Sequence, residues 1–150
     1  MKIDERVEPL VREAFAAAIA RDADRLTEAV TAIAAAGDQT ATDAINLALK
    51  ITAYALLDIH EGFTPDQEQI HDLAKDFCEM EEWAVPDEAA AVKLLTALGN
   101  VSSVEAVLRP EEIAVLLFVL GAWLLTAFLP DDKHWPQYLD EILDDLERNG

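Results

Sequence analysis

The sequence has few of the residues that interrupt helices or carry covalent chemistry. There is one cysteine, Cys78, so the chain can form no internal disulfide and no zinc site from several thiolates. Only 5 glycines and 6 prolines occur in 150 residues, whereas alanine, the strongest helix former, occurs 26 times. The composition therefore predicts an all-α protein, and the length is typical of one domain covering residues 1–150.

Basic residues are also scarce: 11 Lys and Arg stand against 30 Asp and Glu, for a net charge of −19. Such a chain is repelled by nucleic-acid phosphates and by anionic membranes, so neither is expected as a partner, whereas a basic protein would be attracted. Solubility or a high-salt cytoplasm would also explain the acidity. The first ten residues, MKIDERVEPL, do not resemble a signal peptide. With a single cysteine, this favours a cytoplasmic protein.

One apolar run without charges extends from Ile113 to Leu129. Its 17 residues would span roughly 25 Å as a helix, which is less than the ~30 Å hydrocarbon core of a membrane. Acidic residues flank it on both sides, where a membrane span usually carries lysine or arginine. The run therefore predicts a buried central helix; an apolar dimer face and a membrane span are the alternatives.

The spacing of apolar residues predicts a bundle of six or seven helices. Their approximate ranges are 4–21, 25–36, 40–61, 64–83, 86–99, 110–129 and 136–149. Helices 40–61 and 110–129 are expected at the centre. The first of these carries a stripe of small residues, Ala41, Ala44, Ala48, Thr52 and Ala55. Since glycine inside a helix is unfavourable, Gly121 predicts that helix 110–129 crosses this stripe closely.

Capping patterns mark several helix boundaries. Thr64 and Gln67 have the spacing of a capping box, which predicts Thr64 as the N-cap of helix 64–83. Gly37 is expected as the left-handed cap of helix 25–36, and Gly99-Asn100 as the end of helix 86–99. Ser102 and Glu105 predict one further helical turn.

Negative charge is concentrated in two segments. Residues 63–88 contain nine acids and one base, a net charge of −8, and residues 131–150 contain seven acids and two bases, a net charge of −5. If helices 64–83 and 136–149 lie side by side, their acids form one surface suited to a basic protein partner. The predicted partner-binding residues are Glu68, Asp72, Asp76, Glu79, Glu82, Asp144 and Asp145, with Trp83 and Trp135 as apolar anchors. An ordinary solvated face is the other interpretation.

A metal site is an alternative. Glu68-Gln69-Ile70-His71 has the E-x-x-H spacing of di-iron bundles, and Asp58, His60 and Glu61 precede it. The di-iron pattern needs two such elements and two further glutamates, and this chain has one. A small apolar ligand between helices 40–61 and 64–83 is also possible, with Tyr54, Phe118, Trp123 and Phe128 around it. No cofactor is predicted.

The sequence contains no arrangement of residues that favours nucleophilic catalysis. Cys78 stands among carboxylates, which would raise its pKa and keep it a thiol. Serine occurs only at positions 102 and 103, and there is no glycine-rich phosphate loop and no G-x-S-x-G motif. The sequence therefore favours a non-enzymatic interaction protein of the immunity or adaptor type, as a monomer or a homodimer.

Overall fold

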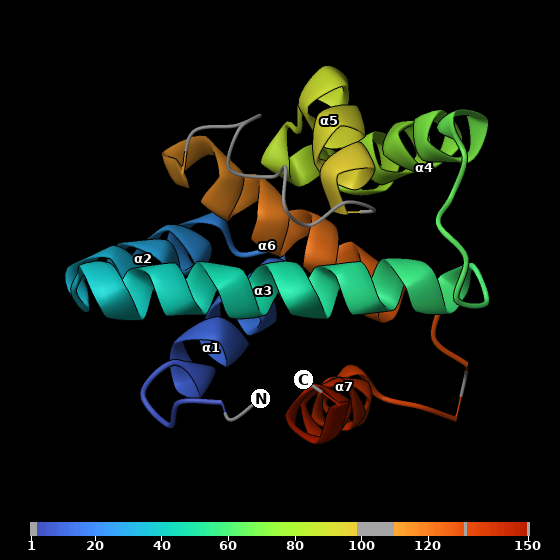
Figure 1. Ribbon diagram of the computed structural model, residues 1–150. Helices are drawn as coiled ribbons and strands as arrows, with labels where there is room; N and C mark the ends of the chain where they lie inside the picture. Colours follow the sequence, from blue (N-terminus) through green and yellow to red (C-terminus); the bar gives the residue numbers. More distant parts are fainter. Residues whose placement is uncertain (1–2, 99–109, 131, 150) are drawn as a thin grey trace.

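The computed structural model describes residues 3–98, 110–130 and 132–149. Seven α-helices and one short 3-10 helix, η1, lie in these ranges, which contain no strand (Figure 1). In chain order they are α1 (Glu8–Ile19), α2 (Ala23–Ala35), α3 (Asp38–Ile59), α4 (Gln67–Met80), η1 (Glu82–Ala84), α5 (Glu88–Leu98), α6 (Pro110–Thr126) and α7 (Trp135–Asn149). The predicted all-α bundle is confirmed.

Helix α6 is the centre of this bundle and contacts α1, α2, α3, α5 and α7. Every residue from 117 to 125 is buried. Figure 1 shows α3 crossing in front of α6, with α4 and α5 on one side of α3 and α1 and α7 on the other. The apolar run of the sequence is therefore the helix around which the others pack, as predicted. Within the described ranges, no helix has the length and apolar character needed to cross a membrane.

The crossing of α3 and α6 is close because Gly121 has no side chain. A Cβ atom at this position would lie 2.7 Å from Oγ1 of Thr52 on α3 and 2.5 Å from Cε1 of Phe15 on α1. Ala48, Thr52 and Ala55 are completely buried at the contact. The predicted crossing on the small-residue stripe is thus confirmed, and α1 packs on the same point.

The start of α4 differs from the prediction. Asp66, not Thr64, is the N-cap, and its carboxylate accepts a hydrogen bond from the Gln69 backbone N–H at 2.8 Å. The Gln69 side chain accepts in return from the Asp66 N–H at 2.9 Å. Both residue pairs have capping-box spacing, but the later one leaves Pro65 buried ahead of the helix and adds a carboxylate at the positive end of the helix dipole.

Other helix ends shift by a few residues. Helix α4 ends at Met80 instead of Trp83, and η1 then leads to Val85, whose backbone is left-handed. Gly37 has a positive φ of 107°, but with ψ at 156° it forms the N-cap of α3 and not a left-handed cap of α2. The turn predicted at Ser102 and Glu105, and the helix end predicted at Gly99-Asn100, lie outside the described residues.

Candidate interaction surface

The outward side of α4 is a row of exposed carboxylates. Its apolar residues Ile70, Ala74 and Phe77 are buried, so the acids spaced between them at helical intervals face away from the core. We call the following exposed residues the α4 acidic face: Glu68, Asp72, Asp76 and Glu79 on α4, with Glu82 on η1. None of them takes part in an ion pair within the described part of the chain. Among the described residues this face therefore carries five carboxylates outside any ion pair, although Lys75 of the same helix lines a hollow with Glu79 and Glu82.

The ion pairs found in the described ranges lie outside the α4 acidic face. They join Arg6 to Asp4, Arg12 to Glu8 and Asp140, Arg21 to Glu81, Arg25 to Glu13, and Lys133 to Glu141. Helix α4 contains one basic residue, Lys75, which forms no ion pair with any described residue. These pairs do not include the α4 acidic face, although one of them joins Arg21 to Glu81 at the end of α4.

Helix α7 does not join this face. It packs against α3 and α6, and Figure 1 shows it on the opposite side of α3 from α4. Two of the predicted residues of α7 also have different surroundings from those on α4. Asp145 accepts a hydrogen bond from the Tyr54 hydroxyl of α3, and Trp135 is partly buried against the core. Asp144 is exposed. The predicted joint surface of the two helices is therefore not formed, because their apolar faces bind different sides of the bundle.

Two tyrosine–aspartate hydrogen bonds connect α3 and α7 in opposite directions. Tyr54 of α3 donates to Asp145 of α7, and Tyr138 of α7 donates to Asp58 of α3 at 2.6 Å. The bond to Asp145, together with burial, raises the pKa of Tyr54 to about 12. Burial, followed by the bond to Asp58, raises the pKa of Tyr138. Part of the acidity of α7 thus serves to hold this helix in place.

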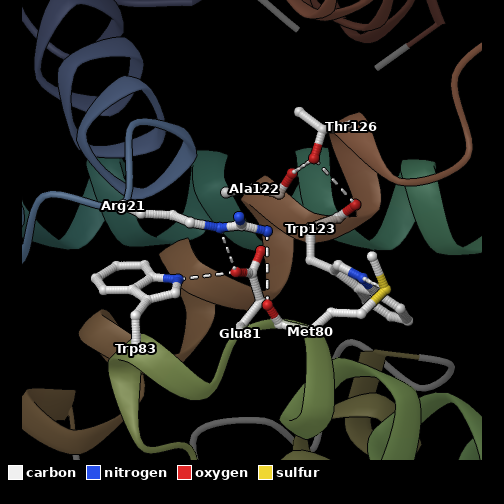
Figure 2. Close-up of polar contacts among 7 residues, drawn as sticks. All are labelled: Arg21, Met80, Glu81, Trp83, Ala122, Trp123 and Thr126. Atoms are coloured by element: carbon white, nitrogen blue, oxygen red, sulfur yellow. Dashed lines mark hydrogen bonds and ion pairs between the residues drawn. The ribbon is translucent and has the colours of Figure 1, made fainter.

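Trp83 is not a free anchor for a partner either. Its indole N–H donates to the Glu81 carboxylate at 2.8 Å, and the Nε of Arg21 donates to the same oxygen at 3.2 Å (Figure 2). Glu81 is only 5% exposed, although it lies in an acidic run. Arg21 reaches it from the turn between α1 and α2, where its φ is +56°. The three side chains fasten that turn to the end of α4.

Two exposed apolar side chains lie near this junction. Met80 and Phe128 are 52% and 46% exposed, and both contact the buried Trp123. The Trp123 indole N–H points at the Met80 sulfur, 3.2 Å away (Figure 2), and the rings of Trp123 and Phe128 are 5.3 Å apart. Met80 is the last residue of α4. One helical turn from Asp76, it borders the α4 acidic face.

The residues of the alternative metal site are not brought together. Among the described residues, no group of three or more His, Cys, Asp or Glu side chains could hold a metal ion. The candidates at the end of α3 have other partners: Asp58 accepts from Tyr138, and Nδ1 of His60 lies 2.8 Å from the Leu56 carbonyl. Glu61 follows the helix in a left-handed conformation, while Glu68 and His71 are exposed on α4.

The aromatic residues of the alternative ligand site pack against the protein itself. Phe118 is buried edge-to-face on Phe15 at 5.0 Å, and Trp123 is buried beside Phe77 at 5.6 Å. Tyr54 is directed to Asp145. Phe118 and Trp123 of the suggested ligand site therefore belong to the core, whereas Phe128 is exposed.

Cys78 lies half-buried between α4 and the start of α5. Burial raises the pKa of its thiol, and the charges of Glu88 and Asp87 raise it further. The pKa is raised, as predicted, but burial is a larger cause than the neighbouring carboxylates. A thiol held in its neutral form is a poor nucleophile.

Comparison of the chain with protein-family models, with curated protein sequences and with solved structures finds no match.

Proposed function

We propose that this chain is a non-enzymatic interaction protein whose α4 acidic face binds a basic surface on a protein partner. The observation that carries the proposal is the row of five exposed carboxylates that form no ion pair among the described residues. The acids of α7 contribute less to the argument, because Asp140, Glu141 and Asp145 contact side chains of the protein itself. The cytoplasm, which a single cysteine favours, is the proposed location.

The position of these charges opposes the stability of α4. Asp72 and Asp76 are one helical turn apart, where like charges repel each other. Glu79 stands in the last turn, where the helix dipole disfavours an anion. A partner that brings lysine or arginine to this face would relieve both effects. Since screening reduces charge interactions beyond about 8 Å at physiological salt, the contribution to affinity requires close contact, while the longer-range field speeds encounter.

The test compares two variants with equal loss of charge. The first neutralises α4 through Glu68→Gln, Asp72→Asn, Asp76→Asn and Glu79→Gln. The control neutralises four exposed acids elsewhere that form no ion pair with described residues, through Glu5→Gln, Glu28→Gln, Asp132→Asn and Asp144→Asn. Each immobilised protein is used to capture partners, which are identified by mass spectrometry. We expect one basic protein that binds the parent and the control but is lost from the α4 variant.

Two results would contradict the proposal. Equal loss of the captured protein from both variants would show that total charge, and not the α4 acidic face, decides binding. Full retention by the α4 variant would place the interface elsewhere. Circular dichroism of each variant provides the check that the helices are intact.

A further inference from the structure

Close to the end of α4, an apolar groove of about 370 Å³ runs between α6 and the segment that joins η1 to α5. Its lining includes Val85 and Asp87 of this segment and Val115, Leu116 and Val119 of α6. Val85 and Val115 are 86% and 40% exposed, so two branched apolar side chains at this groove meet solvent.

Val85 has an unfavourable backbone conformation for its residue type. Its φ of 48° and ψ of 54° are left-handed, which disfavours a β-branched side chain and would suit glycine or asparagine. Burial does not offset this strain, because the side chain is almost entirely exposed. Its backbone N–H donates to the Glu82 carbonyl at 2.9 Å, a contact that glycine would retain. The fold itself therefore gives no reason for valine at this position, whereas an apolar contact with another molecule would.

The groove has an acidic border. Asp87 lines it, and the next residue, Glu88, lines an adjacent hollow together with Lys75, Cys78, Glu79 and Glu82. Residues of the segment 82–90 thus line both the groove and this hollow, to which Glu79 and Glu82 of the α4 acidic face also belong. A second copy of this chain, at a net charge of −19, would bring acids against acids. A basic molecule is complementary to this border.

From the groove, the strained valine and the acidic border together, we propose that the groove receives the apolar side chains of a basic amphipathic helix from a partner protein. Leucine-like residues on one side of the helix occupy the groove, and lysines or arginines on its flank meet Asp87, Glu88 and the α4 acidic face. The inference rests on the proposed function and adds the chemical nature of the partner segment.

The test uses two synthetic peptides of equal length and equal positive charge. One has leucine at every third and fourth position and lysine elsewhere; the other has alanine in place of leucine. Fluorescence anisotropy at physiological salt measures their affinity for the parent protein, for Val85→Gly, for Val115→Ser, and for the four-residue α4 variant. The matched control is Phe63→Ser, which changes a 75% exposed apolar residue in the loop before α4, away from the groove.

We expect the parent to bind the leucine peptide at least tenfold more tightly than the alanine peptide. Val85→Gly and Val115→Ser should each reduce this preference at least threefold, and Phe63→Ser should leave it unchanged. Val85→Gly should also raise the Tm, because it removes strain without removing a buried contact. This combination of higher stability and weaker binding is not expected of a purely structural residue.

The outcomes separate the two proposals. Equal binding of both peptides, lost in the α4 variant, would overturn the groove proposal and leave the charged face. Loss of leucine preference in the groove variants with full binding by the α4 variant would support the groove and contradict the role of α4. Binding of neither peptide would contradict both. A parent dimer that Val85→Gly and Val115→Ser convert to monomer would identify a second copy as the occupant and overturn the proposal.

Discussion

The Thr52 hydroxyl of α3 lies 2.7 Å from the point where a side chain on Gly121 of α6 would begin. The two central helices therefore meet at a distance that alanine does not permit. Gly121→Ala must displace Thr52 or Phe15, and we expect it to lower the free energy of unfolding by about 1–3 kcal/mol. Urea denaturation followed by circular dichroism measures the change. A stability equal to the parent would contradict the close crossing.

A double variant gives the control for this contact. Thr52→Ala removes the hydroxyl that faces Gly121, so Gly121→Ala should be less destabilising in that background than in the parent. If the effects of the two substitutions on the free energy of unfolding were strictly additive, the two positions would not be in contact.

The only two tyrosines of the chain both donate hydrogen bonds between α3 and α7, so tyrosinate absorbance reports on this interface alone. The folded pKa of Tyr54 is raised from the ordinary 10.0 to about 12. The stability that this bond contributes is therefore fully present below pH 10 and is lost as the pH rises towards 12. An ultraviolet titration should show little tyrosinate at pH 10 while the protein is folded.

Asp145→Asn tests the hydrogen bond that Tyr54 donates to Asp145. Since it removes the charge that stabilises the protonated hydroxyl, it should lower the pKa of Tyr54 and shift part of the absorbance change to lower pH. Ionisation of both tyrosines near pH 10 in the folded parent protein would contradict the α3–α7 contacts.

Glu68 and Glu79 stand at opposite ends of α4, so the same substitution should change stability in opposite directions. Glu79→Gln removes an anion from the last turn and should stabilise the protein by about 0.3–1 kcal/mol, whereas Glu68→Gln in the first turn should destabilise it by a similar amount. Thermal unfolding at low salt measures both. Both substitutions should nevertheless weaken binding of a basic partner. If both substitutions changed the Tm in the same direction, the helix dipole would not be the cause of their effects.

The buried carboxylate of Glu81 receives two donors, from Trp83 and Arg21. Glu81→Ala leaves the Trp83 indole N–H without this partner and should reduce stability by about 1–3 kcal/mol. Arg21→Gly should have a smaller effect, because the loss of its ion pair is partly offset by relief of the positive φ at this position. Urea denaturation compares the two variants. Glu81→Ala with parental stability would contradict a structural role for the buried pair.

The sequence was sufficient to predict the helices and the central crossing, because both follow from local spacing. Apolar periodicity located the seven α-helices of the described residues to within a few positions, and the small residues on both sides of the crossing indicated Gly121 as its centre. The start of α4 was misplaced because Thr64 and Asp66 each have a glutamine three residues later. Local spacing alone could not decide between them.

The arrangement of the surface depended on tertiary structure that the sequence does not reveal. The sequences of α4 and α7 are both rich in Asp and Glu, but the two helices lie on opposite sides of α3 (Figure 1). Glu81 and Glu82 are neighbours, yet one is buried and the other exposed, because the chain leaves the helix between Met80 and η1. Exposure of Val85 and Val115 similarly depends on how α6 and α5 meet.

The most direct test of the account is the affinity of the captured basic protein for the four-residue α4 variant and for its charge-matched control, measured by titration calorimetry at low and at physiological salt. The account predicts at least a tenfold loss of affinity for the α4 variant, which corresponds to about 1.4 kcal/mol, and a weaker salt dependence. The control should bind like the parent. An α4 variant that binds as tightly as the control, with the same dependence on salt, would contradict the assignment of the α4 acidic face as the binding surface.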